Sequence, residues 1–262
     1  MIKLIATDMD GTLLNDQNQL PTEFQEVYQA LMEKGIIFGA ASGRQYYNLI
    51  ERFTDQKDDM LFIAENGTFV VHKGKELFAN TLPRDVAMKL IEIGRTIEDA
   101  YIILCGKKSA YIERSTPELL EQVDKYYARR EIVEDLTQVD DEVLKVTILD
   151  FKGAEDNSNH FFSEYREQLQ VAVSGFLWLD ITNGDANKGT AIQKVQEYFG
   201  ITSEQTMVFG DYLNDLDMMR QAYYSFAMAN AHGEIKNVAR FEAETNNEAG
   251  VMKSIRQYVL SK

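Results

Sequence analysis

Short apolar runs alternate with amphipathic stretches along the first 80 residues of the chain. The apolar runs lie at 3–8, 36–42 and 61–67, and each of them ends in polar residues or glycine. Between them, apolar residues recur every three or four positions over 22–35 and 43–53, a spacing that places them on one side of a helix. We therefore predict three strands that alternate with two helices.

The same alternation returns in the last third of the chain. Apolar runs at 206–211 and 224–230 predict strands, and the patterns at 188–200, 213–222 and 248–260 predict helices. Short apolar strands that alternate with helices are typical of a parallel sheet covered by helices on both faces. The two ends of the chain are therefore expected to build one doubly wound sheet.

The middle of the chain follows a different pattern. Two apolar segments flank Gly106, Lys107 and Lys108, as expected for a hairpin, and further segments combine paired strands with helices. The elements expected in this region are helices at 84–95, from Thr116 onward and at 158–169, and strands at 100–106, 109–114, 144–151, 171–175 and 176–182. This arrangement predicts an α+β domain.

These patterns together define the expected fold class. We predict an α/β chain with a doubly wound, mostly parallel, Rossmann-like core sheet and an inserted α+β cap domain. The core is expected to comprise residues 1–82 and 186–262, and the cap residues 83–185.

Polar residues and glycines follow every predicted core strand at its carboxyl end. They are Asp8 and Asp10, Ser42 to Arg44, Glu65 to Gly67, Gly210 and Asp211 with Asn214 and Asp215, and Asn230. In a doubly wound sheet the carboxyl ends of the parallel strands meet at one edge, and ligands bind there. We therefore expect these residues to form a single site.

The carboxylates of this edge predict a metal site. Asp8 and Asp10 project in the same direction because strand side chains alternate, and Asp211 should arrive from a neighbouring strand. Converging carboxylates repel one another, and one takes up a proton unless a cation joins them. Oxygen ligands favour Mg²⁺ when waters and a phosphate complete its shell. An ordinary turn is the alternative explanation of Asp-x-Asp-Gly-Thr alone.

Two basic residues at the same edge predict an anion site. Lys188 follows Asn187, a suitable N-cap, and Arg44 is also expected in the first turn of a helix. A cation is slightly unfavourable at a helix N-terminus, which carries partial positive charge. An anion bound between the helix end and the cation reverses that effect. Phosphate is the simplest candidate.

Composition limits the expected partners and location. The net charge of −15 disfavours nucleic acid or an anionic membrane surface as a partner. No apolar run is long enough for a transmembrane helix, and the N-terminus lacks the pattern of a signal peptide. One cysteine, Cys105, fits a reducing compartment, so we expect a cytoplasmic protein without membrane attachment.

Four motifs in a fixed order connect these residues to a known family. They are DMDGT at 8–12, SGR at 42–44, NKG at 187–189 and GDYLND at 210–215. With them, the chain resembles the haloacid dehalogenase-like (HAD) phosphatases along essentially its whole length. The resemblance is to the Cof-type subfamily, which has a type IIB cap inserted after the third core strand. It implies a Mg²⁺-dependent hydrolase of small phosphorylated metabolites, above all sugar phosphates.

The resemblance also implies roles for single residues. Asp8 would be the nucleophile that forms an aspartyl-phosphate, and Asp10 the general acid and base. Ser42 and Lys188 would hold the phosphoryl group, and Lys188 would also balance the charge of Asp8. The implied metal ligands are Asp8, the backbone carbonyl of Asp10, Asp211, and Asp215 as a partner through water. The implied substrate-binding residues are Gly43, Arg44, Asn66 and Asn214, and Thr12 is expected to support the loop.

Two other functions remain open at this point. A phosphotransferase or phosphomutase would use the same aspartyl-phosphate, but only 31 residues separate Asp10 from Ser42, too few for the helical cap of mutase-like relatives. A non-catalytic, phospho-regulated binding module would also use an aspartate, a serine, a lysine and Mg²⁺. Such a module needs neither a cap nor an acid/base at Asp10. We therefore favour the phosphatase.

Overall fold

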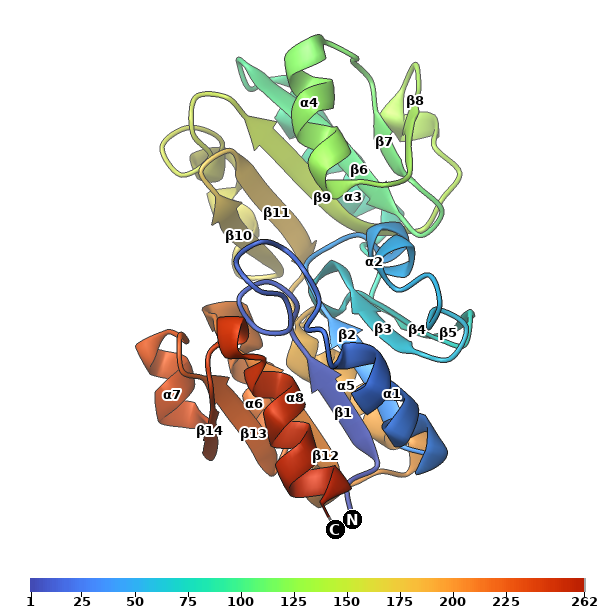
Figure 1. Cartoon of the computed structure of the whole chain (residues 1–262). Helices are drawn as coiled ribbons and strands as arrows, with labels where there is room; N and C mark the ends of the chain where they lie inside the picture. Colours follow the sequence, from blue (N-terminus) through green and yellow to red (C-terminus); the bar gives the residue numbers. More distant parts are fainter. Residues whose placement is uncertain (262) are drawn as a thin grey trace. The chain divides into compact units, whose positions relative to one another are not determined.

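The computed structural model describes residues 1–261, which form two compact units (Figure 1). The first, here called the core unit, comprises Met1–Gly43, Phe53–Phe78 and the residues from Asn187 onward. The second, the cap unit, comprises Arg44–Arg52 and Ala79–Ala186. The core unit is therefore assembled from both ends of the chain.

The core unit is built on an eight-stranded sheet with the strand order β14-β13-β12-β1-β2-β3-β4-β5. The strands are β1 (Leu4–Thr7), β2 (Ile37–Ala41), β3 (Leu61–Ala64), β4 (Phe69–His72), β5 (Lys75–Ala79), β12 (Thr206–Gly210), β13 (Tyr224–Met228) and β14 (Phe241–Ala243). The strands from β14 to β3 run parallel, and β4 is antiparallel to β3. The mostly parallel core sheet predicted from the sequence is therefore confirmed.

Helices cover this sheet on both faces. They are α1 (Phe24–Glu33), α5 (Lys188–Phe199), α6 (Leu216–Gln221), α7 (Gly233–Val238) and α8 (Gly250–Ile255), with short turns η1 (Glu65–Gly67), η4 (Ser203–Gln205), η5 (Leu213–Asp215), η6 (Asn246–Glu248) and η7 (Arg256–Leu260). Phe24 of α1 lies 5.8 Å from Phe38 of β2, between ring centres. Leu4 of β1 instead belongs to the buried cluster that contains Ile192 of α5. Alternate strand residues thus serve opposite faces.

Some core elements differ from the expected ones. The helix expected over 213–222 begins as the 3₁₀ turn η5, and the last helix begins at Gly250 and ends in a π-helical turn. Strands β4, β5 and β14 were not predicted. The turn between β4 and β5 is formed by Lys73 and Gly74, both with positive φ. A Lys-Gly pair is a weaker hairpin signal than Asn-Gly, so the pattern alone does not reveal it.

The cap unit contains a six-stranded sheet with the order β10-β11-β9-β6-β7-β8. Its elements are α2 (Tyr46–Arg52), α3 (Arg84–Arg95), β6 (Ala100–Gly106), β7 (Ala110–Ile112), α4 (Pro117–Tyr126), β8 (Arg130–Ile132), η2 (Leu136–Gln138), β9 (Val143–Asp150), η3 (Ser158–Tyr165), β10 (Leu169–Gly175) and β11 (Trp178–Asn183). All neighbouring pairs are antiparallel except β7 and β8. The helix expected over 158–169 is a 3₁₀ segment that ends at Tyr165, because β10 begins at Leu169.

The two faces of the cap sheet pack against different helices. Leu90 of α3 lies in one buried cluster with Ile148 of β9. Leu119 of α4 lies in another with Leu149, the next residue of the same strand. Cys105 belongs to this second cluster and is 1% exposed, which agrees with a packing role. The second sheet therefore forms a compact α+β unit with its own core.

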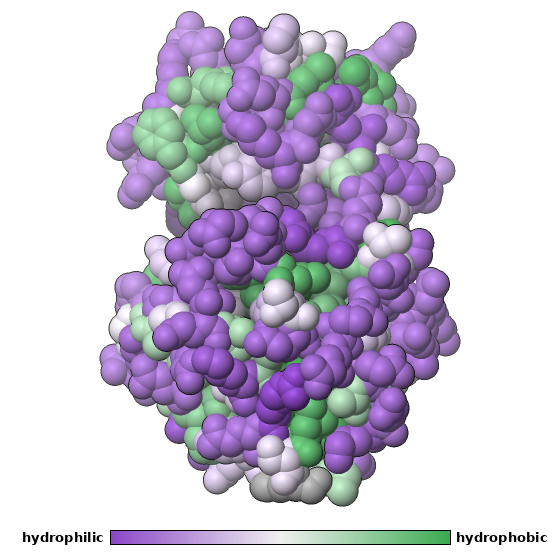
Figure 2. Space-filling view, in the orientation of Figure 1, coloured by the Kyte–Doolittle hydropathy of each residue, from purple (hydrophilic) through white to green (hydrophobic). Residues whose placement is uncertain are grey.

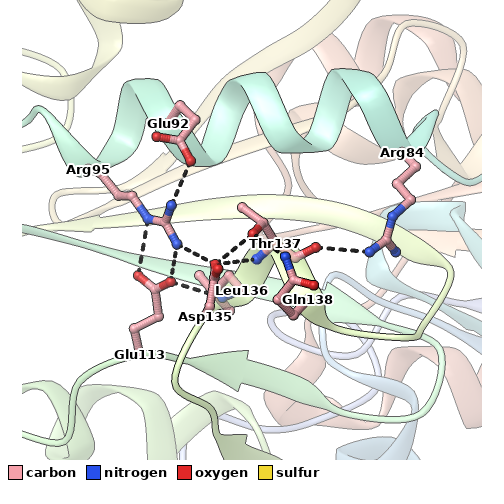
Figure 3. A network of polar contacts seen from close by, with 8 residues as sticks. All are labelled: Arg84, Glu92, Arg95, Glu113, Asp135, Leu136, Thr137 and Gln138. Atoms are coloured by element: carbon pink, nitrogen blue, oxygen red, sulfur yellow. Dashed lines mark hydrogen bonds and ion pairs between the residues drawn. The ribbon is translucent and has the colours of Figure 1, made fainter.

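A network of charged side chains ties α3 to the segment that precedes β9 (Figure 3). Arg95, the last residue of α3, donates to Asp135 at 2.7 Å and to Glu113. Asp135 also accepts from the backbone N–H of Thr137 at 2.9 Å. At the other end of α3, Arg84 donates to the carbonyl of Thr137 at 2.9 Å. Both ends of the helix thereby hold η2.

Residues 44–52 belong to the cap unit rather than to the core unit. The expected helix over 43–53 is α2, which begins only at Tyr46, so Arg44 precedes the helix instead of lying in its first turn. The domain boundaries at 82/83 and 185/186 stay a prediction. The compact units differ from them at α2 because side chains of this segment bond to Arg129 and Lys107.

Polar residues dominate the surface of both units on the face that Figure 2 draws, and hydrophobic residues form only small separate groups there. Among residues 1–261, no helix has both the length and the apolar character needed to cross a bilayer.

Candidate active site

The predicted site residues gather at the carboxyl edge of the core sheet. Asp8 follows β1, Ser42 follows β2 and Asp211 follows β12. Because β1 lies between β12 and β2, these three residues stand at the ends of adjacent parallel strands. The backbone N–H of Asp8 donates to the carbonyl of Phe209 at 3.0 Å, which extends the ladder to the site itself.

Lys188 holds two aspartates together at the centre of this edge. Its Nζ lies 2.6 Å from Oδ1 of Asp8 and 2.7 Å from Oδ1 of Asp215. The side chains of Lys188 and Asp215 are fully buried. Lys188 is the first residue of α5, and Asn187 caps that helix by accepting from the N–H of Thr190 at 2.8 Å. The expected N-cap at Asn187 is therefore confirmed.

Asp215 also organises the loop that carries Asp211. Its Oδ2 accepts from the backbone N–H of Asp211 at 3.0 Å and from that of Tyr212 at 3.3 Å. A Cβ atom at Gly210 would lie 2.6 Å from this oxygen, so the loop requires a glycine there. Asp215 thus fixes both Lys188 and the backbone of the neighbouring carboxylate.

Three carboxylates of the site are close enough to share one ion. Oxygen atoms of Asp8, Asp211 and Asp215 all lie within 4.8 Å of one another. The hydroxyl of Thr12 donates to Oδ1 of Asp211 at 2.8 Å, in keeping with the supporting role expected for Thr12. A Cβ atom at Gly11 would lie 2.9 Å from Cγ of Asp211, so the turn can approach this carboxylate only with a glycine.

Burial and mutual repulsion shift the pKa values of this group. Burial raises the pKa of Asp8 to about 8; Lys188 opposes the shift and Asp215 adds to it. Burial raises the pKa of Asp211 to about 6, against the hydrogen bond from Thr12 and together with repulsion by Asp215. Burial by itself would lower the pKa of Lys188, but Asp215 and Asp8 outweigh it and raise the pKa.

The donor set fits a hard divalent cation. Lys188 supplies one positive charge beside the carboxylates of Asp8, Asp211 and Asp215. Burial is the main cause of the raised pKa values of Asp8 and Asp211, and repulsion by Asp215 adds to both shifts. A cation between the three carboxylates would remove that repulsion. Ligands that are all oxygen suit Mg²⁺ or another hard ion. The identity of the ion stays a prediction.

Asp10 lies outside this group of three side chains. It is exposed, its backbone forms an isolated bridge with Leu14, and its charge contributes to the raised pKa of Asp211. An exposed carboxylate next to a buried one has access to solvent protons, as a general acid and base requires. The implied role of its backbone carbonyl as a metal ligand stays a prediction.

The other predicted site residues of the core unit form a second polar group beside Ser42. The N–H of Asn66 donates to the carbonyl of Ser42 at 2.9 Å, and the side chain of Asn214 donates to Oδ1 of Asn66 at 3.2 Å. Gly43 faces the same side chain, since a Cβ atom there would lie 3.0 Å from Nδ2 of Asn66. The backbone of Asn66 is left-handed, with φ 55°. The strand ends of β2 and β3 are thereby joined to η5.

Arg44 is the one predicted site residue that belongs to the cap unit. It donates to Oδ1 of Asn48 at 3.2 Å, within the same segment. Its expected place in the first turn of a helix is wrong, because the backbone at Gln45 accepts the first bond of α2, from the N–H of Leu49 at 3.1 Å.

Two asparagines support the site, and only the first of them, Asn230, was expected there. The side chain of Asn230 donates to the carbonyl of Gly11 at 2.8 Å and accepts from the N–H of Asn246 at 3.1 Å. Asn246 donates to the carbonyl of Leu14 at 3.0 Å. They brace the loop after β1 from β13 and η6. The position of Asn230 at a strand end was a usable signal, whereas nothing local marks Asn246.

Comparison with known proteins places this geometry in a family. The profile of the haloacid dehalogenase-like hydrolases matches residues 5–255. The 5-amino-6-(5-phospho-D-ribitylamino)uracil phosphatase YbjI of Escherichia coli (strain K12) is 34% identical over 264 residues, which cover 97% of this chain and 95% of that protein. The phosphatase YcsE of Bacillus subtilis (strain 168), which carries the same activity in its name, is 31% identical and covers 99% and 96%.

A solved structure agrees over the whole chain. SMU.1108c from Streptococcus mutans UA159 superposes with a TM-score of 0.85 at 31% identity and covers 100% of both chains. The chain therefore belongs to the haloacid dehalogenase-like hydrolases, within which it is a phosphatase of the Cof type with a subclass IIB cap. The resemblance inferred from the four motifs is confirmed.

Proposed function

We propose that the chain hydrolyses small phosphate monoesters through an aspartyl-phosphate on Asp8, with Mg²⁺ held by Asp8, Asp211 and Asp215. The observation that carries this proposal is the position of Asp8, whose carboxylate lies 2.6 Å from the ammonium group of Lys188 and within 4.8 Å of oxygen atoms of Asp211 and Asp215. When bound, Mg²⁺ would neutralise negative charge on the phosphoryl group that is transferred.

Asp8 is suited to attack phosphorus once it is ionised. A carboxylate oxygen forms the new bond to phosphorus while the bond to the leaving oxygen breaks, and Asp10 gives its proton to that oxygen. In the second step Asp10 accepts a proton from water, which attacks the aspartyl-phosphate and releases inorganic phosphate. Lys188 favours the ionised form of Asp8, which is the attacking group in the first step and the leaving group in the second.

In this proposal Ser42 binds the phosphoryl oxygens, and the predicted residues near it bind the rest of the substrate. Ser42 stands at the end of the strand next to β1 and is 2% exposed. Gly43, Arg44, Asn66 and Asn214 are assigned to substrate binding. Donors that hold the phosphoryl oxygens would contribute positioning and electrostatic stabilisation, which are the main sources of catalysis for such esters.

The proposed substrates are phosphate esters of small polyhydroxylated compounds. The curated relatives YbjI and YcsE are named as phosphatases of 5-amino-6-(5-phospho-D-ribitylamino)uracil, in which a polyol chain carries the phosphate. Sugar phosphates, the class expected from the sequence, share that chemistry. The ribitylaminouracil phosphate is therefore the first compound to test, followed by sugar phosphates. A cytoplasmic location is part of the proposal and is supported by the single, buried Cys105.

Phosphate release from a panel of these compounds tests the proposal. The assay compares Mg²⁺ with EDTA, and wild type with Asp8→Asn and with Asp124→Asn, a control carboxylate in the cap unit that pairs with Arg130. We expect release that requires Mg²⁺, is lost in Asp8→Asn and persists in Asp124→Asn. Transfer of phosphate to a sugar hydroxyl, without free phosphate, would instead favour the phosphotransferase. No reaction from a folded protein that binds Mg²⁺ would favour the non-catalytic module.

A further inference from the structure

A buried glutamine fastens the chain after the SGR motif to the cap sheet. Gln45 is 4% exposed, and its side-chain amide makes two hydrogen bonds with a single residue, Arg129. The backbone N–H of Arg129 donates to Oε1 of Gln45 at 3.0 Å, and Nε2 of Gln45 donates to the carbonyl of Arg129 at 2.8 Å. The amide thus satisfies the backbone N–H and the backbone carbonyl of Arg129, as the backbone of a neighbouring strand would.

The partner of Gln45 is a fixed point of the sheet. Arg129 directly precedes β8, and its carbonyl also accepts from the N–H of Ala110 in β7 at 3.1 Å. Both lone pairs of this carbonyl are therefore used, one by β7 and one by Gln45. The contact joins the segment to the β7–β8 ladder rather than to an independent loop.

A second residue of the same segment contacts the same part of the cap unit. The guanidinium of Arg129 lies 4.9 Å from the ring centre of Tyr47, a cation–π arrangement. The hydroxyl of Tyr47 donates to the carbonyl of Lys107 at 3.2 Å. Two side chains at the start of α2 thus bind to Arg129, directly before β8, and to Lys107, in the turn between β6 and β7.

Helix formation does not explain why a glutamine occupies this position. Gln45 is the N-cap residue of α2, since the N–H of Leu49 donates to its carbonyl. N-cap side chains are typically short and accept from their own helix. The Gln45 side chain turns away to Arg129 instead, so its length and amide serve the contact between segment and sheet.

The position of Gln45 in the sequence gives this contact a functional meaning. It directly follows Arg44, a proposed substrate-binding residue, and lies three residues after Ser42. The division between the compact units falls between Gly43 and Arg44, so the SGR motif is shared: Ser42 belongs to the core unit and Arg44 to the cap unit. Whatever fixes Gln45 to β8 also fixes the backbone of Arg44.

We propose that Gln45 is a positioning residue, which acts through Arg44 on the binding of the phosphorylated substrate. Its amide holds the Arg44 backbone on the β7–β8 ladder of the cap unit. This inference rests on the proposed function, because it takes Arg44 as a ligand of the phosphate ester. Loss of the amide weakens substrate binding only while Arg44 is present.

A double-mutant cycle tests this dependence. The variants are Gln45→Met, which keeps length but removes both hydrogen bonds, Arg44→Met, and the double variant. Gln56→Met is the matched control, since Gln56 is also buried and bonds through its amide, but to Gln25 in the core unit. The readouts are KM and kcat for the best substrate of the panel, the Kd of inorganic phosphate by calorimetry with Mg²⁺, and the melting temperature.

The expected result is a non-additive cycle. Gln45→Met raises KM and the phosphate Kd by about 3- to 10-fold, a coupling of ordinary size for residues in contact. Adding Gln45→Met to Arg44→Met changes neither constant further, and Gln56→Met leaves both within about twofold of wild type. If Gln45→Met fails to fold, Gln45→Asn, which keeps an amide but is one methylene shorter than the side chain that makes both hydrogen bonds to Arg129, replaces it and should also weaken binding.

Two results would overturn the inference. One is a cycle in which the effects of Gln45→Met and Arg44→Met multiply, and the other is a Gln45 variant that binds phosphate as well as Gln56→Met does. Either can occur in an active phosphatase, in which case only the positioning role fails. A wild type that releases no phosphate from any compound, but whose phosphate binding depends on Gln45 through Arg44, overturns the proposed hydrolysis and supports the positioning role.

Discussion

Lys188 and Asp8 form a buried ion pair, with Nζ of the lysine 2.6 Å from Oδ1 of the aspartate. They are 180 residues apart in the sequence and meet because α5 begins where β1 ends. Asp215 binds the same ammonium group at 2.7 Å. Burial raises the pKa of Asp8, and Lys188 opposes this shift, so the ammonium group favours the ionised form in which the carboxylate can act as a nucleophile.

Replacing Lys188 should destabilise the fold as well as abolish activity. Lys188→Met leaves two buried carboxylates without their cation, and breaking a buried pair in this way costs about 3 to 5 kcal/mol. Urea unfolding measures the loss. Lys194→Met, on the exposed side of the same helix, should change stability by less than about 0.5 kcal/mol. Equal stability of the two variants would contradict the role given to the pair.

Magnesium should bind more tightly as the pH rises from 6 to 8. The pKa of Asp8 is raised to about 8 without a cation, so at pH 7 this side chain carries a proton that the metal must displace. Where one proton is released, the affinity should rise about tenfold for each pH unit. Calorimetry in buffers of different ionisation enthalpy counts the protons. Binding that is independent of pH would show that Asp8 is not a ligand.

The raised pKa of Asp8 also predicts how the stability of the metal-free protein depends on pH. Because the pKa of Asp8 is higher in the folded state than its ordinary value of 3.8, the folded protein binds more protons between these two values. Stability from this group therefore falls as the pH rises from about 4 to about 8. Saturating Mg²⁺ should remove the decline. Melting curves across this range, with EDTA and with Mg²⁺, provide the measurement.

Gly11→Ala should destabilise the protein more than a glycine substitution at a comparable backbone position. Gly11 has φ 77° and Gly35 has φ 66°, but a new Cβ meets Asp211 only at Gly11 and meets nothing within 4 Å at Gly35. Gly35→Ala should lose about 1 to 2 kcal/mol for the left-handed backbone alone. Gly11→Ala should lose more and should also bind Mg²⁺ more weakly. If both variants bind the metal equally well, the approach of this turn to Asp211 has no role in the site.

Arg95→Met should raise the pKa of Asp135. Hydrogen bonds from Thr137, and then from Arg95, lower the pKa of this carboxyl to about 2 (Figure 3). With Arg95 removed, the value should move toward 3.8 without reaching it, because Thr137 remains. Asp135 stabilises the fold above its unfolded pKa, and this contribution disappears as the pH falls from about 4 to 2. Carboxyl NMR titration of both proteins checks the shift, and an unchanged value would contradict the network.

Local patterns in the sequence were enough to predict five parallel strands of the core sheet, β1, β2, β3, β12 and β13, and the acidic edge at their carboxyl ends. The strand residues of the core are apolar runs closed by aspartate, serine or glycine, and a parallel sheet places such ends together. Asp8, Lys188 and Asp211 follow from that rule and from the motifs. The N-cap at Asn187 followed from a local signal as well, because capping involves neighbours within four residues.

Contacts between distant segments were beyond the reach of these patterns. Asn246 reaches Leu14 over 232 residues, and Gln45 reaches Arg129 over 84. An asparagine or glutamine offers the same hydrogen-bonding groups in any loop, so its partner depends on the complete fold. Contacts between distant segments also explain why α2 belongs to the cap unit and why Lys188 pairs with Asp215.

The division of the core unit between the two ends of the chain has a consequence for biosynthesis. Strand β1 ends at Thr7, but its neighbour β12 begins only at Thr206. At about 5 to 20 residues per second, translation needs roughly 10 to 40 s to bring the second strand out after the first. During that interval one side of β1 has no strand to pair with, and the whole cap sequence emerges before β12 does. The nascent chain therefore carries an open, apolar strand edge, a natural target for ribosome-associated chaperones.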